Sequence, residues 1–165
     1  AALERCSPPP GRMETLVATG KPLAIIDYAH TPDALEKLLG AARKHTTGEL
    51  ICIFGCGGDR DPGRRPVMAA VAERLADQVI VTDDNPRTED GDAIVADIVK
   101  GFTAPARALI ERDRARAIAQ GIALGKPGDV VVIAGKGHED YQIVGTERGR
   151  FSDPEVARDV LGQRP

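Results

Sequence analysis

The sequence of 165 residues has no tryptophan and only five aromatic side chains, three phenylalanines and two tyrosines. So few stacking platforms argue against a protein that binds single-stranded nucleic acid through its bases. The core must be built mainly from alanine, valine, isoleucine and leucine. An excess of charge of one sign is missing too, because 22 lysines and arginines face 25 aspartates and glutamates, for a formal net charge of −3. This mild balance predicts no nucleic-acid partner and no adhesion to an anionic membrane.

Long apolar segments and a disulfide framework are also missing. The longest apolar runs, such as Val130–Ala134, contain about five residues, far below the ~20 that span a bilayer, and no secretory signal is recognisable. The three cysteines, Cys6, Cys52 and Cys56, are odd in number, which indicates reduced thiols and a cytoplasmic protein. No second pair of cysteines or histidines has the spacing of a tetrahedral zinc site, so we expect Cys52 and Cys56 to be buried and inert.

Prolines mark the beginning of the sequence. Residues 8–10 are three consecutive prolines, which hold the chain extended and donate no backbone hydrogen bonds. We therefore expect residues 1–10 to be a linker from a preceding domain. Residues 11–165 have the size of one ordinary domain, large enough to bury about two thirds of the surface of its unfolded chain.

Strand and helix patterns alternate after Gly11. Short apolar runs predict six strands, at Glu14–Ala18, Leu23–Asp27, Leu50–Phe54, Val79–Thr82, Ala108–Ile110 and Val130–Ile133. Five helical patterns lie between and after these strands. Four have a start signal: Thr31 with Pro32, Pro66, Asp113, and Ser152 or Asp153 with Pro154. The fifth runs through Ile94 and Val99. This alternation predicts an α/β fold with a mostly parallel sheet covered by helices on both faces.

Polar loops follow four of the predicted strands. They are Asp27–His30, Gly55–Asp61, Asp83–Arg87 and Gly135–Asp140. Ligands of such sheets bind beyond the carboxyl ends of the strands, so we expect these loops to meet along one rim and to form a site there.

Each loop, taken singly, also has a structural interpretation. Gly55–Asp61 matches neither common phosphate-binding motif, so it is either a tight structural turn or a loop whose backbone approaches an anion closely. Arg60 could be part of a local ion-pair network, and Arg87 could be solvated in a turn that precedes a helix near Asp90. Capping is the simpler role for Asp27 and for His30 when each is considered alone.

The sequence gives no support for nucleophilic catalysis. His138 and Glu139 are adjacent, and adjacent residues do not share a face, so no catalytic dyad follows from them. We predict no catalytic residue and no metal ligand in this chain.

Five segments together resemble a known family. They are Gly11–Glu14, Asp27–Leu35, Gly55–Asp61, Asp84–Arg87 and Gly135–Gln142. In this order they are similar to the C-terminal domain of the Mur ligases, and within that family to the type that adds meso-diaminopimelate to UDP-N-acetylmuramoyl-L-alanyl-D-glutamate in peptidoglycan synthesis. The resemblance covers essentially the whole chain after residue 10.

The resemblance implies a Rossmann-like domain of a three-domain, ATP-dependent, amide-forming ligase. ATP would phosphorylate the γ-carboxylate of the D-glutamate residue, and the amino group of meso-diaminopimelate would attack the acyl phosphate. The other partners would be the UDP-sugar dipeptide and the N-terminal and central domains. The phosphate loop of the central ATPase domain has no counterpart in residues 1–165, and most Mg²⁺ ligands would lie in that domain too. We therefore expect the chain to be inactive by itself.

The resemblance also implies roles for ten residues. The meso-diaminopimelate pocket would contain Arg60, Asp84, Asn85, Pro86, Arg87, Gly135 and Glu139. ATP would be contacted by Arg12, Asp27 and His30. The chemistry fits, because diaminopimelate is a zwitterion at both ends and needs a cation for its distal carboxylate and an acid for its distal ammonium, for which Arg87 and Glu139 are suitable.

Two other functions stay open at this point. A lysine-adding Mur ligase is disfavoured by Asn85-Pro86-Arg87, since lysine-adding relatives differ there. A stand-alone, non-catalytic module that binds an amino acid or a nucleotide would differ in its upstream coding sequence, which would lack the central domain's phosphate loop.

Overall fold

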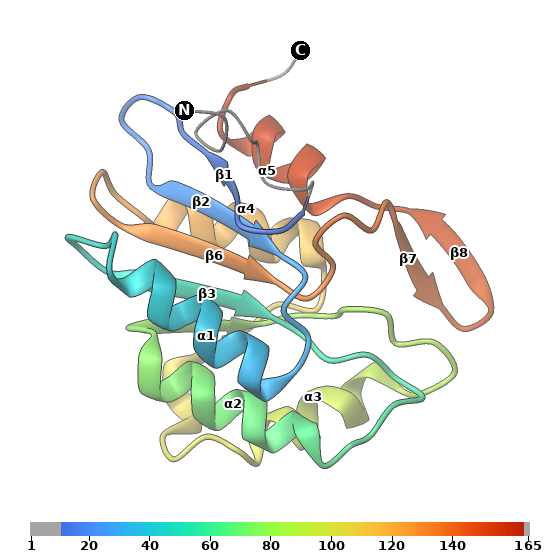
Figure 1. The fold of residues 1–165 in the computed structure, drawn as a ribbon. Coiled ribbons are helices and arrows are strands. Elements are labelled where there is room, and N and C mark those ends of the chain that lie inside the picture. The colour runs from blue at the N-terminus through green and yellow to red at the C-terminus, as the bar shows by residue number, and fades with distance from the viewer. Residues whose placement is uncertain (1–10, 164–165) are drawn as a thin grey trace, which may run out of the picture.

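The computed structural model describes residues 11–163, so the predicted linker at residues 1–10, with Cys6, lies outside the described residues. Six strands form one sheet: β1 (Glu14–Leu16), β2 (Leu23–Asp27), β3 (Leu50–Phe54), β4 (Gln78–Val81), β5 (Ala108–Ile110) and β6 (Val130–Ala134). Their order across the sheet is β1-β2-β6-β3-β4-β5. The edge strand β1 is antiparallel to β2, and all other neighbours are parallel (Figure 1). The predicted α/β fold with a mostly parallel, six-stranded sheet is confirmed.

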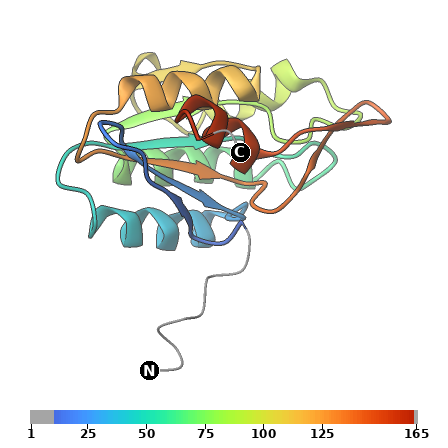
Figure 2. The ribbon, with the colours of Figure 1, turned by 90° about the horizontal axis from the view of Figure 1, so that it is seen from above.

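Helices cover both faces of this sheet. α1 (Pro32–Arg43), α2 (Arg64–Leu75) and α3 (Gly91–Val99) pack on one face, and α4 (Arg114–Leu124) and α5 (Asp153–Val160) pack on the other. Figure 2 shows α1 and α4 on opposite sides of the strands. A short 3₁₀ turn, η2 (Pro105–Arg107), precedes β5.

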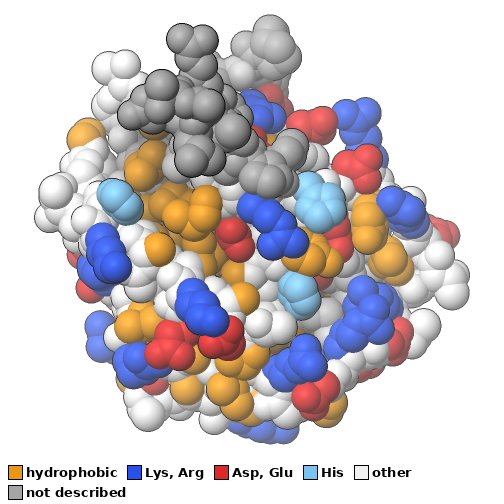
Figure 3. All heavy atoms as spheres, viewed as in Figure 1, with side chains coloured by type: hydrophobic (Ala, Val, Ile, Leu, Met, Phe, Trp, Pro, Cys, Tyr) orange, Lys and Arg blue, Asp and Glu red, His pale blue; other side chains and the backbone are white. Residues whose placement is uncertain are grey.

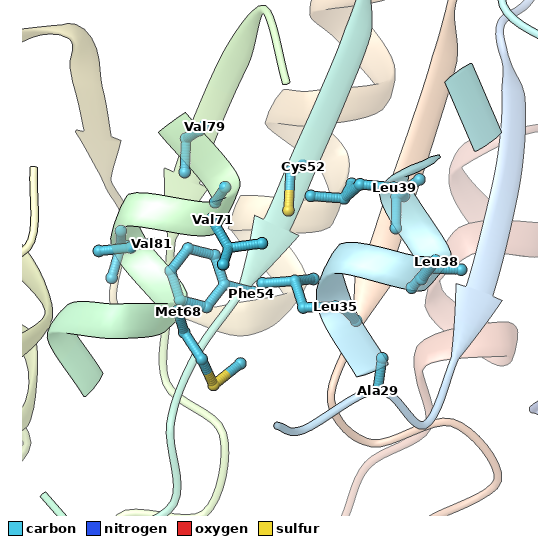
Figure 4. Close-up of a cluster of buried hydrophobic side chains, with 14 of the residues drawn as sticks. Ala29, Leu35, Leu38, Leu39, Cys52, Phe54, Met68, Val71, Val79 and Val81 are labelled. Carbon is cyan, nitrogen blue, oxygen red and sulfur yellow. The ribbon is translucent and has the colours of Figure 1, made fainter. Parts of the chain in front are cut away.

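The alternation of side chains along buried strands divides the core in two. In β3, Leu50, Cys52 and Phe54 face α1 and α2, whereas Ile51 and Ile53 face α4. Figure 4 shows Phe54 beside side chains of the two covering helices on that face. All five residues are fully buried, as expected for a central parallel strand covered on both sides.

Helix boundaries follow the predicted capping residues with one exception. Thr31, Asp113 and Ser152 each accept a hydrogen bond from a backbone amide in the first turn of α1, α4 and α5. Asp90, which was not predicted as a cap, does the same for α3. The predicted start of α2 at Pro66 is wrong by two residues, since the helix begins at Arg64. Pro66 occupies the first turn, where its missing N–H removes no helical hydrogen bond.

A two-stranded hairpin is an element that the sequence did not predict. It consists of β7 (Tyr141–Val144) and β8 (Glu147–Arg150), which pair in antiparallel fashion and project from the side of the sheet (Figures 1 and 2). All four residues of β8 are exposed, so no apolar pattern marks it.

Smaller differences concern strand ends. β1 ends at Leu16 instead of Ala18, β4 spans Gln78–Val81 instead of Val79–Thr82, and β6 extends to Ala134. On the face shown in Figure 3, basic and acidic side chains are interspersed, in keeping with the near balance of charge. Within residues 11–163, no helix is long and apolar enough to cross a membrane.

Candidate functional site

A pocket of about 240 Å³ lies beyond the carboxyl ends of β2, β3, β4 and β6. All four predicted loops contribute to its lining, so the expectation that they meet along one rim is confirmed. Seven of the ten predicted site residues line it: His30, Arg60, Asp84, Asn85, Arg87, Gly135 and Glu139. Pro86, Arg12 and Asp27 are not part of the lining.

The glycine-rich loop after β3 packs closely against the neighbouring loop 84–87. A Cβ atom at Gly58 would lie 1.8 Å from the carbonyl oxygen of Pro86, and one at Gly57 would lie 2.8 Å from Nη1 of Arg87. The amide of Gly58 also donates to the carbonyl oxygen of Asn85 at 2.9 Å. Since side chains at these positions would collide with the loop 84–87, the glycines are needed for loop packing.

Arg87 is held from both its backbone and its side chain. Its φ of 55° is in the left-handed region, where a non-glycine residue is uncommon. Its amide donates to the carbonyl oxygen of Ile143 at 3.1 Å, and its carbonyl oxygen accepts from the amide of Gly145 at 2.7 Å. Its Nη1 donates to the carbonyl oxygen of Gly58 at 2.7 Å. The alternative of a freely solvated Arg87 is therefore wrong, although the helix that follows does begin after Asp90.

Lys136, Asn85 and Glu139 form a hydrogen-bonded triangle at the wall of the pocket. Lys136 Nζ donates to Asn85 Oδ1 at 3.0 Å and to Glu139 Oε2 at 2.9 Å, and Asn85 Nδ2 donates to the same Oε2 at 3.0 Å. Burial alone would raise the pKa of Glu139, but the hydrogen bonds from Lys136 and Asn85 outweigh it and lower that pKa. Glu139 is therefore a carboxylate at neutral pH.

A second buried charge cluster lies beside this triangle. Arg114 and Asp153, both fully buried, form a bidentate pair with two 2.7 Å contacts. Asp84 lies close by, and its burial raises the pKa of its carboxyl group against the opposing effect of Arg114 and Lys136. Gly135 has a φ of +121°, and a Cβ atom there would lie 2.6 Å from Asp84 Oδ2, so this position also requires glycine.

Cations dominate the wall formed by the loop after β3 and the start of α2. Arg65 is almost fully buried and pairs with Glu89 and Asp97, whereas Arg64 pairs with Asp61 at 3.4 Å. Arg60 is exposed and donates to the carbonyl oxygen of its neighbour Asp59 at 3.1 Å. The expected ion pair of Arg60 with its flanking aspartates is thus replaced by a bond to a backbone carbonyl.

The three residues expected to contact ATP lie around Tyr28. The Arg12 guanidinium is 5.6 Å from the centroid of the Tyr28 ring, and the His30 ring is 4.6 Å from it. The carboxylate of Asp27 accepts from the amides of Met13 and Ala29 at 2.8 Å each. Asp27 therefore stabilises a turn and does not cap α1, because Thr31 has that role.

The two cysteines of the described residues differ in burial: Cys52 is fully buried, as expected, whereas Cys56 is half-buried and lines the pocket. Burial raises the pKa of Cys52 to about 12, and burial together with the charge of Asp84 raises that of Cys56 to about 12. Neither forms a disulfide. Across residues 11–163, no group of three or more histidines, cysteines, aspartates and glutamates could hold a metal ion.

The family "Mur ligase, glutamate ligase domain" matches residues 11–137, which is most of the chain. The chain belongs to the Mur ligase family. The resemblance read from the five motifs is thereby confirmed, as is the Rossmann-like fold of this Mur ligase domain.

Two curated relatives are UDP-N-acetylmuramoyl-L-alanyl-D-glutamate–2,6-diaminopimelate ligases. The protein of Parasynechococcus marenigrum strain WH8102 is 58% identical over 160 residues, which cover 94% of this Mur ligase domain and 32% of the relative. The protein of Xanthomonas oryzae pv. oryzae strain MAFF 311018 is 57% identical over 170 residues, covering 99% and 34%. The chain thus spans about a third of the length of the curated relatives it matches.

Solved structures agree with the fold. A UDP-N-acetylmuramoyl-L-alanyl-D-glutamate–2,6-diaminopimelate ligase superposes with a TM-score of 0.88 at 42% identity, covering 96% of the Mur ligase domain and 32% of that chain. A folylpolyglutamate synthase from Thermotoga maritima gives a TM-score of 0.60 at 25% identity, covering 81% and 29%.

Several residues of the site were not predicted from the sequence. Tyr28, Asp61, Arg64 and Arg65 line the pocket, and Lys136 supports two of its side chains. The available signal for Lys136 was its position between two glycines directly after an apolar strand. Gln142 ends the fifth segment of the resemblance, but its contact with the loop 84–87, in which its Nε2 donates to the carbonyl oxygen of Asp84 at 2.8 Å, was not expected because β7 itself was not predicted.

Proposed function

We propose that the chain is the amino-acid-selecting domain of an ATP-dependent ligase that adds meso-diaminopimelate to UDP-N-acetylmuramoyl-L-alanyl-D-glutamate. The observation that carries the proposal is the composition of the pocket. The guanidinium groups of Arg60 and Arg87 and the carboxylate of Glu139 line one cavity, which suits a ligand that carries both a carboxylate and an ammonium. The curated relatives with this name support the same substrate.

The proposed roles follow from the contacts of each side chain. Arg87 uses Nη1 for Gly58, which leaves its other donors for the distal carboxylate of diaminopimelate, with Arg60 beside it. Glu139 would receive the distal ammonium, and Asn85, which donates to Glu139 at 3.0 Å, would hold that carboxylate in one orientation. Asp84, Pro86 and Gly135 shape the wall behind these contacts.

The chemical step would occur outside these residues. ATP would phosphorylate the γ-carboxylate of the D-glutamate residue, and the amine of meso-diaminopimelate would attack the acyl carbon, so that an amide forms and phosphate leaves. Arg12, Asp27 and His30 would contact ATP from one side. Most Mg²⁺ ligands would belong to another part of the ligase, as the resemblance implies, and we assign no step to the metal here.

Amino-acid-dependent phosphate release by the full-length protein tests the proposal. With ATP and UDP-N-acetylmuramoyl-L-alanyl-D-glutamate present, we expect release with meso-diaminopimelate and at least a hundredfold lower kcat/KM with L-lysine, since sites built for a charged group can reject its absence by ~10⁴-fold. Equal use of the two amino acids would favour a lysine-adding ligase. No release with either would favour a binding module.

A further inference from the structure

Lys136 is a buried cation that the proposed substrate contacts do not use. Its side chain is 0% exposed, and it lies directly after β6 between Gly135 and Gly137. Both glycines have positive φ values, +121° and +52°, so the backbone turns sharply on either side and directs the lysine inward. The ammonium group also lies 5.3 Å from the centroid of the Tyr141 ring.

Burial of the Lys136 ammonium group costs free energy, which indicates that the residue has a function here. Removing an ammonium group from water is unfavourable and is offset only by good partners. Both side-chain acceptors of Lys136, Asn85 Oδ1 and Glu139 Oε2, belong to residues that line the pocket. Lys136 itself does not line the pocket, so it can act on a ligand only through these two side chains.

The triangle fixes the orientation of the Asn85 amide. Asn85 Oδ1 accepts from Lys136 Nζ at 3.0 Å and from the amide of Ile143 at 2.9 Å, while Nδ2 donates to Glu139 at 3.0 Å. A flipped amide would turn its NH₂ group toward two donors and its oxygen toward a carboxylate. All three contacts would become repulsive, so only one orientation is compatible with Lys136.

The triangle also fixes the carboxylate of Glu139. Both hydrogen bonds from Lys136 and Asn85 fall on Oε2. A carboxylate has about four acceptor sites, so Glu139 keeps acceptor capacity for an ammonium group of a ligand while its position is set from behind.

We propose that Lys136 is a positioning residue for the amino-acid pocket. Without touching the substrate, it holds Glu139, directly and through Asn85, in the geometry in which that carboxylate receives the substrate ammonium. The inference rests on the proposed function for the identity of the substrate. Its structural part, the control of Asn85 by Lys136, can be tested without any substrate.

The first test measures the steady-state kinetics of the full-length protein. In Lys136→Met we expect the KM for meso-diaminopimelate to rise roughly tenfold or more, because the pocket loses its preorganised acceptors, while kcat and the KM for ATP stay within about threefold. Lys37→Met, which removes an exposed lysine on α1, is the matched control and should change none of these values. Lys136→Gln keeps one donor and should give an intermediate KM, and it replaces Lys136→Met as the test if that variant does not fold.

The second test uses the fact that Asn85 is the only asparagine in the chain. Labelling asparagine with ¹⁵N in the chain of 165 residues gives a single side-chain NH₂ pair in the NMR spectrum. We expect its exchange with water to be at least about tenfold faster in Lys136→Met than in the wild type, because the hydrogen-bonded triangle is opened, and unchanged in Lys37→Met.

The outcomes separate the two proposals. Two results would overturn the positioning role. One is that Lys136→Met changes neither the KM for meso-diaminopimelate nor the exchange of the Asn85 amide. The other is that Lys136→Met raises the KM for meso-diaminopimelate and the KM for ATP equally and also lowers the melting temperature. A wild-type protein that does not prefer meso-diaminopimelate would overturn the proposed function alone, since the Asn85 measurement would still decide the role of Lys136.

Discussion

At the scale of single residues, the wall of the pocket depends on buried charges that are paired. Arg114 and Asp153 are both fully buried, and Arg114 also donates to the carbonyl of Ala134 at 3.0 Å. This contact joins the first residues of α4 and α5 to the end of β6. The pair therefore sets the floor against which Asp84 and Gly135 pack.

Asp153→Asn should destabilise the chain by about 3–5 kcal/mol, because a buried arginine then lacks its compensating charge. Urea unfolding followed by circular dichroism at neutral pH measures the free energy of unfolding. Glu155→Gln, two residues further along α5 and paired with the exposed Arg150, is the control and should change little. A loss for Asp153→Asn as small as that of the control would show that the buried pair contributes little.

The buried thiols predict a loss of stability in alkali. The pKa values of Cys52 and Cys56 are raised from 9.0 to about 12, so the folded chain keeps protons that the unfolded chain has lost. Stability should therefore fall as the pH rises from about 9 toward 12, by up to about 1.4 kcal/mol per pH unit for each thiol. Urea unfolding at pH 7.5, 9 and 10 under reducing conditions measures this slope.

Cys52→Ala serves as the comparison for that slope. It should lower stability at every pH, because it leaves a cavity, but its loss between pH 9 and 10 should be smaller than that of the wild type. The same slope in both proteins would exclude Cys52 as its source.

At the scale of elements, the hairpin β7–β8 is the support of the loop 84–87. Gln142 donates to the carbonyl of Asp84, the amide of Ile143 donates to Asn85 Oδ1, and the backbone of Arg87 bonds on both sides to Ile143 and Gly145. One short strand thus holds most of the predicted selectivity loop through hydrogen bonds.

Gln142→Ala should weaken the use of meso-diaminopimelate without unfolding the domain. The loss of one hydrogen bond, worth about 0.5–1.5 kcal/mol, predicts a decrease of roughly 2- to 12-fold in kcat/KM of the full-length protein. Gln163→Ala is the control, because it removes a similar hydrogen bond, from Gln163 Nε2 to the carbonyl oxygen of Val17, away from the loop 84–87. It should leave kcat/KM unchanged. An equal decrease in both variants would argue against a special role of β7.

Much of this architecture could be predicted because its signals are local. The apolar runs in the sequence predicted the first and last residues of β2, β3 and β5 correctly. Capping side chains such as Thr31 and Asp113 predicted where α1 and α4 begin. The meeting of four loops at one rim followed from the parallel sheet alone. β8 could not be predicted, because it is polar and fully exposed.

The supporting contacts of the site were beyond local reasoning. Lys136 and Asn85 are 51 residues apart in the sequence. They meet only because the order of strands across the sheet brings their loops together. The roles of Gly57 and Gly58 were ambiguous for the same reason, since the loop 84–87 that requires them is distant in sequence.

At the scale of the whole molecule, the proposed function makes the chain one part of a larger catalytic assembly. It spans about a third of its curated relatives, and its described residues contain no metal site. Phosphoryl transfer depends on a phosphate-binding loop, its lysine and a metal ion, and none of these is evident in the chain.

The chain of 165 residues should therefore neither hydrolyse ATP nor form the amide. Phosphate release by the purified chain in the presence of all substrates should not exceed the background without protein. Binding of ATP, measured by calorimetry, should be weaker than micromolar, because a half-site loses contact area and preorganisation. Diaminopimelate-dependent phosphate release, or micromolar binding of ATP, would contradict the expectation that the chain of 165 residues is inactive by itself.

The central claim, selection of diaminopimelate by this pocket, is tested most directly at Arg87. The measurement is kcat/KM for meso-diaminopimelate and for L-lysine in the full-length wild type, Arg87→Ala and Arg87→Lys, with the exposed Arg74→Ala as control. Arg87→Ala should reduce kcat/KM for meso-diaminopimelate by roughly 30- to 900-fold, equivalent to about 2–4 kcal/mol. Arg87→Lys should recover part of it, because an ammonium cannot form the bidentate contact. Use of lysine should fall far less, since lysine has no distal carboxylate, and an equal loss for both amino acids would contradict the account.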